Sequence, residues 1–313
     1  MSAKRPQCYG RSSPGEDNPS GVPASNNDPD LALARAAAQA YSPRPLTDGE
    51  RWTVEALFQL RRCGYRPAAW MRFIRKSLQR SAQARNARPQ MARQADRWGA
   101  VGAAGWLATC HLARDRPGLS INRAAGLLWW LSVWRMLDWH LGMAEGGDGR
   151  PHERLSPADA LTLTRFWLVP LVPGVRRSRW GLPAVIITGG LTDWLDGAVA
   201  RRYGRTRLGR DLDTTADLAF LGTAAASARS AGRLSELGAW SLGVRYALGT
   251  SVALAAVFGR ARRPAVRARP LGAAVRVGGL ALAAGGWQRT GTAMLVIGCL
   301  VPPRSTAPQR SPA

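Results

Sequence analysis

The chain has 313 residues and carries 44 Lys and Arg against 20 Asp and Glu, a formal net charge of +24. Its 34 glycines follow no period, its four cysteines stand far apart, and 46% of its residues are hydrophobic. This composition excludes collagen, a coiled coil, a disulfide scaffold and a fully disordered chain. Two classes remain, a basic nucleic-acid-binding protein and a membrane protein with basic loops.

The first third of the chain is polar and then strongly basic. Residues 1–48 are rich in Pro, Ser, Asn, Gly and Asp, which predicts a disordered tail. In residues 49–97, apolar side chains such as Val54, Leu57 and Phe58 recur at spacings of three and four, which predicts basic amphipathic helices. The basic face of this arm binds anionic lipid or nucleic acid, or it is simply solvated, and the sequence leaves these alternatives open.

Apolar stretches recur from residue 98 onward. None reaches the ~18 uninterrupted apolar residues that identify a membrane-spanning helix by hydropathy alone. Hydropathy therefore permits membrane helices without proving them. Residues 98–150 are predicted to be helical, with room for one or two spans at 98–113 and 124–143, and residues 304–313 form a second tail.

The most informative segment is TDWLDGAVARRYGRTRLGRDLDTTAD at residues 192–217. It contains the pattern D-x2-D-G-x2-A-R-x7-G-x3-D-x3-D. Its first four positions fall at i, i+3, i+4 and i+7 of one helix, and its last three fall at i, i+4 and i+8 of the next, so each set shares a helix face. In order, the eight positions are Asp193, Asp196, Gly197, Ala200, Arg201, Gly209, Asp213 and Asp217.

Four carboxylates would converge if these two helices were antiparallel. Carboxylates brought this close repel one another unless a cation lies between them. Because oxygen ligands favour hard ions, the pattern predicts Mg²⁺ or Mn²⁺, with room for two ions. Two such ions beside Arg201 are suited to group transfer at a pyrophosphate. Gly197 and Ala200 leave space on the helix face for a bulky ligand.

These eight residues resemble the signature of the CDP-alcohol phosphatidyltransferase family, integral membrane enzymes that make phospholipids. The run DALTLTR at residues 159–165 is also similar to the start of the family's first membrane helix, with Asp159 where Asn is common. The resemblance covers residues 155–303. It implies an all-α, polytopic membrane helix bundle with a six-helix core, here drawn at 158–174, 180–201, 211–230, 237–258, 271–286 and 289–303.

The resemblance also implies roles for individual residues. Asp193, Asp196 and Asp213 would bind two metal ions, and Asp217 would be the general base and a further metal ligand. The CDP moiety would be held by a set of nearby positions, with Arg201 at the pyrophosphate. This set comprises Gly197, Ala200, Arg201, Gly209, Thr162 and Thr206.

The acceptor alcohol is less constrained by the sequence. TDWLDG together with RLG is most similar to the phosphatidylglycerophosphate synthase branch, whose acceptor is glycerol 3-phosphate, although Leu218 stands where that branch commonly has Lys. A phosphorylated acceptor requires additional cations beside the site. The candidates are Arg165, Arg210 and Arg245.

The resemblance implies CDP-diacylglycerol or a similar CDP-alcohol as donor, a small or lipid acceptor, contact with membrane lipids and no nucleic-acid partner. A homodimer stays open. Arginines flanking the signature loop outnumber those in the opposite loops, which predicts a multi-pass plasma-membrane protein with its active site facing the cytoplasm. Two rival hypotheses remain: a catalytically inactive membrane scaffold of the same fold, and a membrane protein that binds or transports cations.

Overall fold

The computed structural model describes residues 29–39, 46–116, 119–146, 149–204, 206–258, 266–267, 270–302 and 304–305. Within them the fold is helical apart from one short antiparallel strand pair, β1 (Val266–Arg267) with β2 (Arg304–Ser305), and an isolated bridge between Glu145 and Pro151. The predicted all-α fold class is confirmed for this part of the chain.

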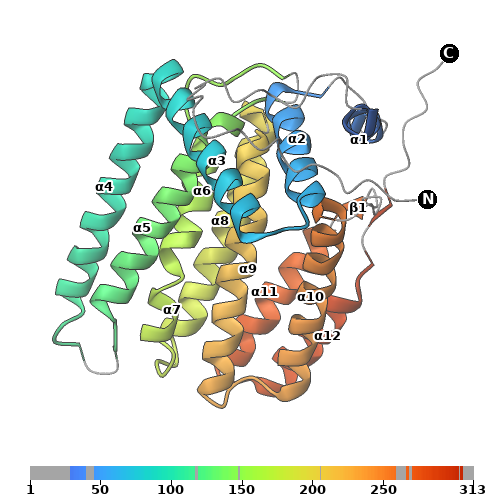
Figure 1. The fold of residues 1–313 in the computed structure, drawn as a ribbon. Coiled ribbons are helices and arrows are strands. Elements are labelled where there is room, and N and C mark those ends of the chain that lie inside the picture. Colours follow the sequence, from blue (N-terminus) through green and yellow to red (C-terminus); the bar gives the residue numbers. More distant parts are fainter. Residues whose placement is uncertain are drawn as a thin grey trace.

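The helices of the second half agree closely with the six predicted segments. The first is divided into α6 (Pro157–Leu168) and α7 (Leu171–Gly174), because Pro170 cannot continue the hydrogen-bond ladder of α6. The other five are α8 (Gly181–Tyr203), α9 (Arg207–Ser230), α10 (Glu236–Phe258), α11 (Pro270–Ala284) and α12 (Gln288–Leu300). Figure 1 shows these helices running side by side as one bundle.

Two further long helices, α4 (Pro89–Leu112) and α5 (Arg123–His140), flank this bundle on one side (Figure 1). Indole groups bind them to each other and to α6. Trp130 donates to the carbonyl of Gly99 at 2.7 Å, and Trp129 donates to the carbonyl of Phe166 at 2.8 Å. Within the predicted helical region 98–150, α4 extends to Leu112 and α5 covers Arg123–His140, followed by a short 3-10 turn at Leu141–Met143.

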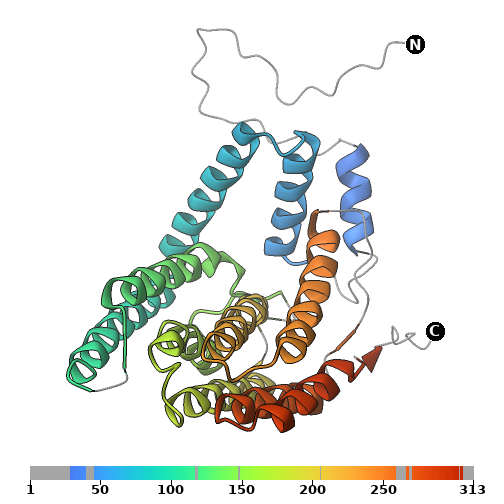
Figure 2. The same ribbon diagram turned by 90° about the horizontal axis from the view of Figure 1, so that it is seen from below.

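The basic arm forms a helical hairpin, α2 (Asp48–Arg62) and α3 (Pro67–Ala87). Thr47 begins α2 with a capping box, in which its hydroxyl accepts from the backbone of Glu50 and the Glu50 carboxylate accepts from the backbone of Thr47. Seen from below in Figure 2, the hairpin projects from the side of the bundle.

The predicted tails need correction at three places. Residues 29–39 form helix α1 (Pro29–Gln39), because an Ala- and Leu-rich segment follows the Pro- and Ser-rich start, and its Leu31 is buried while Arg35 pairs with Glu55 of α2 at 2.5 Å. Residues 304–305 belong to β2 rather than to a tail. The end of the first predicted tail also belongs to the folded part, because Thr47 caps α2 and Asp48 is its first residue. The rest of both predicted tails, 1–28, 40–45 and 306–313, lies outside the described residues.

No helix in the described part of the chain combines the length and the apolar character needed to cross a membrane. The polytopic membrane bundle therefore stays a prediction.

Candidate active site

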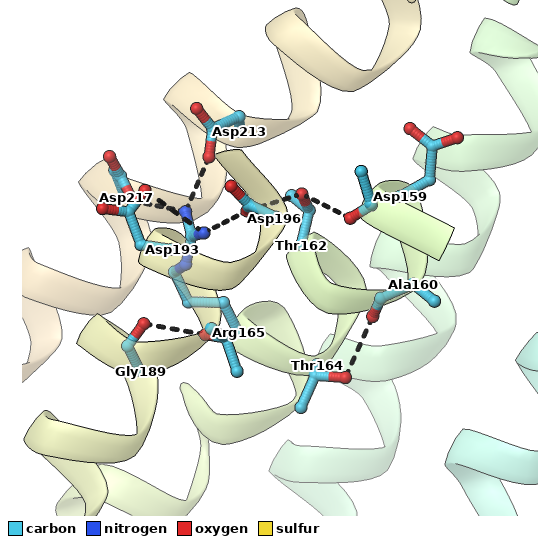
Figure 3. A network of polar contacts seen from close by, with 12 residues as sticks. Asp159, Ala160, Thr162, Thr164, Arg165, Gly189, Asp193, Asp196, Asp213 and Asp217 are labelled. Carbon is cyan, nitrogen blue, oxygen red and sulfur yellow. Dashed lines mark hydrogen bonds and ion pairs between the residues drawn. The ribbon is translucent and has the colours of Figure 1, made fainter. Parts of the chain in front are cut away.

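The four signature carboxylates converge on one side chain, Arg165 of α6 (Figure 3). Its Nη1 contacts Asp213, at 2.8 Å, and Asp217, both of which come from α9. From the α8 side, its Nη2 contacts Asp196 and lies 3.4 Å from Asp193. The helical spacing expected from the sequence thus brings both aspartate pairs to a single point between α6, α8 and α9.

The cluster is closed on one side and open on the other. The side chain of Arg165 is 1% exposed and that of Asp196 is 9% exposed. Asp193, Asp213 and Asp217 are 36%, 40% and 34% exposed, so solvent and ligands reach them. Thr162 donates a hydrogen bond to Asp196 at 3.2 Å, which fixes that buried carboxylate. The three open carboxylates are the ones that a ligand can reach directly.

The donor set fits hard divalent cations. Asp193, Asp213 and Asp217 each offer a carboxylate oxygen, and these three atoms lie within 4.8 Å of one another. In the described part of the chain, Arg165 is the one cation that forms ion pairs with these four carboxylates, so a single paired cation serves four acidic groups. Oxygen ligands with a surplus of negative charge are the environment that Mg²⁺ and Mn²⁺ prefer.

The face of α8 that is predicted to bind the nucleotide contains Gly197. A Cβ atom at Gly197 would lie 3.4 Å from Nη1 of Arg201, so the glycine lets this guanidinium lie over the face of α8. Arg201 is exposed and Ala200 is half-buried one residue before it. Residues 197–201 therefore present a small-residue surface with one accessible cation beside the carboxylates.

The start of α9 is packed against the start of α6. Thr206 caps α9 by accepting from the backbone N–H of Gly209 at 2.9 Å. A Cβ atom at Gly209 would lie 2.8 Å from Oδ1 of Asp159, so only glycine fits there without a shift. Asp159 itself forms a capping box with Ser156, while its Oδ1 is buried with no hydrogen-bond partner among the described residues.

Both threonines predicted for the nucleotide site already have partners within the protein. Thr162 holds Asp196, and Thr206 caps α9. The structure thus gives these two residues supporting positions beside the site.

The three acceptor candidates do not lie together. Arg165 is buried at the centre of the carboxylates. Arg210 is exposed and lies 3.7 Å from Asp211, and Arg245 is half-buried on α10. Among the described residues, neither Arg210 nor Arg245 forms an ion pair with a signature aspartate, so the predicted acceptor cations are not assembled as one group.

Sequence reasoning missed Arg276, a buried arginine of α11. It donates to the carbonyl of Gly298 at 2.9 Å and acts electrostatically on Asp193. Its neighbour Val277 lies against Gly190, one helical turn from Asp193 on α8. A lone arginine within an apolar run was the available signal, since such residues usually face the interior of a bundle.

The family model of the CDP-alcohol phosphatidyltransferases matches residues 155–302. The chain carries a CDP-alcohol phosphatidyltransferase domain. This domain extends from the start of α6 to the end of α12 and contains all eight signature positions. Members of the family are CDP-alcohol phosphotransferases that generally depend on divalent metals, so the domain is that of a phosphotransferase enzyme. Neither curated proteins nor solved structures gave a match to the chain.

Proposed function

We propose that the phosphatidyltransferase domain transfers a phosphatidyl group from CDP-diacylglycerol to an acceptor alcohol and releases CMP, in phospholipid biosynthesis. The observation that carries the proposal is the convergence of Asp193, Asp196, Asp213 and Asp217 around Arg165 at a partly open site (Figure 3). A carboxylate set with surplus negative charge beside Arg201 suits a pyrophosphate substrate bound with divalent cations.

Within this proposal, Asp193, Asp213 and Asp217 hold the ions at their exposed oxygens, together with Asp196. Bound Mg²⁺ or Mn²⁺ neutralises the phosphate oxygens of the donor. Arg201, lying over Gly197, binds the pyrophosphate from the α8 side. Arg165 keeps the two carboxylates of α9 in position and reduces their mutual repulsion.

The transfer itself needs a base. The acceptor hydroxyl oxygen attacks the phosphorus attached to the lipid, and the bond from that phosphorus to the bridging oxygen breaks. CMP leaves with the electron pair of that bond, and Asp217 takes the hydroxyl proton. Asp217 suits this role because its side chain is about a third exposed while Arg165 fixes its orientation.

We also propose that the bundle lies in a membrane with the carboxylate site at the cytoplasmic end. Support comes from large apolar side chains exposed on the bundle and on the helices that flank it, such as Leu248 of α10 at 63% and Leu128 of α5 at 65%. Trp180, Trp240 and Trp287 are exposed near the helix ends remote from the carboxylates, the place where tryptophan favours a membrane interface.

For the acceptor we propose glycerol 3-phosphate, which follows from the similarity of TDWLDG and RLG to the phosphatidylglycerophosphate synthase branch. A phosphorylated alcohol would also suit the arginines around the site, including Arg276 on α11.

The test is CMP release from CDP-diacylglycerol by the purified chain in lipid, with glycerol 3-phosphate, inositol phosphate, serine and phosphatidylglycerol as acceptors. We expect release with glycerol 3-phosphate, loss of turnover in EDTA and recovery with Mg²⁺ or Mn²⁺. Full turnover in EDTA would contradict the metal proposal. Absence of CMP release with every acceptor would favour an inactive scaffold or a cation-binding protein.

A further inference from the structure

The charges of the arm are segregated along its hairpin. Asp48, Glu50 and Glu55 all lie within the first eight of the fifteen residues of α2. Every charged residue from 56 to 95 is basic, so the last turn of α2, the connecting turn and the whole of α3 carry no acid. The end of the hairpin at the α2–α3 turn is therefore strongly cationic, and the opposite end is not.

Two groups of basic residues can be distinguished on the hairpin. Those in the second half of α3, Arg80 and Arg85, face the rest of the protein and form ion pairs there. Arg80 pairs with Asp48 at 2.9 Å and lies over the ring of Trp52, and Arg85 pairs with both Asp96 and Asp138. These cations hold the hairpin in place, so they do not account for the charge at the turn.

The second group surrounds the turn and faces solvent. Its cations Arg62, Arg66 and Arg75 are exposed. Large apolar side chains are exposed between them, Met71 at 62% and Tyr65 and Trp70 each at 37%. We call these six residues the turn surface. Cations mixed with exposed aromatic and thioether side chains are typical of helices that lie in a bilayer interface.

The backbone of the turn is left-handed at two successive residues. Gly64 and Tyr65 both have positive φ, at 62° and 54°. A left-handed conformation is unfavourable for tyrosine, and such residues cluster at functional sites. The hydrogen bond from the Tyr65 N–H to the Leu60 carbonyl, at 3.1 Å, fixes the turn in this form.

From this arrangement, we propose that the turn surface docks on the anionic headgroups of a phospholipid bilayer. Its three arginines contact the phosphates, and Tyr65, Trp70 and Met71 enter the region between headgroups and acyl chains. The apolar half of the surface favours a bilayer over nucleic acid, because phosphate-backbone contacts would use the arginines and leave Met71 exposed. The hairpin projects from the side of the bundle (Figure 2), and the six side chains of the turn surface are all exposed.

A lysine beside the turn surface can be used to detect contact with the bilayer. Lys76 is exposed one residue after Arg75, and Lys4 is the other lysine of the sequence. The full chain would be reconstituted, without any CDP-alcohol, in phosphatidylcholine alone and in phosphatidylcholine mixed with phosphatidylglycerol. The rate of acetylation of Lys76 relative to Lys4 would then be measured by mass spectrometry.

We expect acetylation of Lys76 to be slower by about threefold or more in the anionic mixture, since each arginine contributes about fivefold to affinity for such a surface. High salt should reverse this protection in the unmodified chain. The triple variant Arg62→Gln, Arg66→Gln, Arg75→Gln should lose it. A matched triple variant, Arg114→Gln, Arg177→Gln, Arg179→Gln, removes three exposed arginines far from the hairpin and should keep it.

Equal acetylation in the two lipids, or protection that survives in the first triple variant, would overturn the proposal. Equally strong protection of Lys76 by a short RNA in neutral lipid would show a nucleic-acid surface instead. None of these acetylation measurements depends on turnover. They therefore test the lipid contact independently of the proposed transferase activity.

Discussion

Arg165 is the residue around which the site is built. A fully buried guanidinium is costly unless it is paired, and here four carboxylates from two helices supply the partners. The same carboxylates would repel one another without a cation between them. The ion pairs therefore stabilise both the buried guanidinium and the clustered carboxylates. The surplus of acidic groups over cations would attract a divalent ion.

Asp213 and Asp217 lie one turn apart on α9, yet we expect different consequences when each is replaced. Asp213→Asn removes a metal ligand, so high Mg²⁺ should restore part of its activity. Asp217→Asn removes the proton acceptor and should lower the rate about 10²–10⁴-fold while leaving CDP-lipid binding largely intact. The measurement is turnover against Mg²⁺ concentration for both variants, beside nucleotide binding.

The pattern of rescue decides between the two roles. Added metal should not rescue Asp217→Asn, because the missing group is a base. If metal rescued Asp217→Asn and not Asp213→Asn, the two roles would be reversed.

Arg165→Gln tests whether the guanidinium balances the carboxylates. Removing it leaves the buried carboxylate of Asp196 without its cation, and breaking a buried pair in this way costs about 3–5 kcal/mol. The variant should unfold at a lower temperature in EDTA than the unmodified protein, and Mg²⁺ should raise its Tm more than it raises that of the unmodified protein.

The matched control is Arg210→Gln. Arg210 is exposed and its ion pair with Asp211 is long, so its loss should be within about 1 kcal/mol of neutral. An Arg165→Gln protein as stable in EDTA as the control would contradict the electrostatic role.

At the scale of the elements, glycines set how closely the helices approach. On α8, a Cβ at Gly189 would lie 2.2 Å from the ring of Phe220 on α9. Between α11 and α12, a Cβ at Gly279 would lie 2.9 Å from both the Gly291 carbonyl oxygen and the Leu295 nitrogen. Small residues at helix contacts allow backbones to pack directly, as is common in membrane bundles.

Two adjacent glycines of α11 give a direct test of this packing. Gly279→Ala presses a methyl group against the backbone of α12 and should destabilise the protein by about 1–3 kcal/mol. Gly278→Ala meets only the Met294 methyl at 3.5 Å, so it should be neutral or stabilise by up to about 1 kcal/mol through helix propensity. Thermal unfolding of both purified variants checks the difference, and equal Tm values would show that α11 and α12 are not in this close contact.

At the scale of the whole molecule, the arm is joined to the catalytic domain near the start of α9. The side-chain carboxylate of Glu145 accepts a hydrogen bond from the N–H of Gly49 at the beginning of α2. The backbone carbonyl of Glu145 accepts a hydrogen bond from the N–H of Arg207 at the beginning of α9. Arg207 reaches Thr53 of α2, and burial lowers the pKa of its guanidinium. These contacts link the arm to the helix that carries Asp213 and Asp217.

We nevertheless expect the chemistry to reside in the family domain, because the arm contains no signature residue. A chain beginning at Arg97 should retain CMP release once inserted, at a lower Tm, since Asp138 loses its ion pair with Arg85. The measurements are CMP release and thermal unfolding, with a chain beginning at residue 29 as the control that keeps the arm. A truncated chain that is folded and inserted but inactive would show that the arm belongs to the active site.

The grouping of the carboxylates could be predicted from the sequence because it follows from local spacing, and the resemblance to the family implied the helices of its domain. Residues three and four apart share a helix face whatever surrounds them, so the grouping of Asp193 with Asp196 and of Asp213 with Asp217 was predictable. Helix α1 was missed because the average composition of residues 1–48 concealed a short Ala- and Leu-rich run.

What lies between the two helix faces depends on long-range packing. Arg165 is separated from its partners by about thirty to fifty residues, and no local rule places a guanidinium of one helix between carboxylates of two others. The approach of Arg276 to Asp193 and the contact of Gly49 with Glu145 are of the same kind. These long-range placements depend on how whole helices pack, and the glycines and indoles at the helix contacts, Gly209 of the signature among them, contribute to that packing.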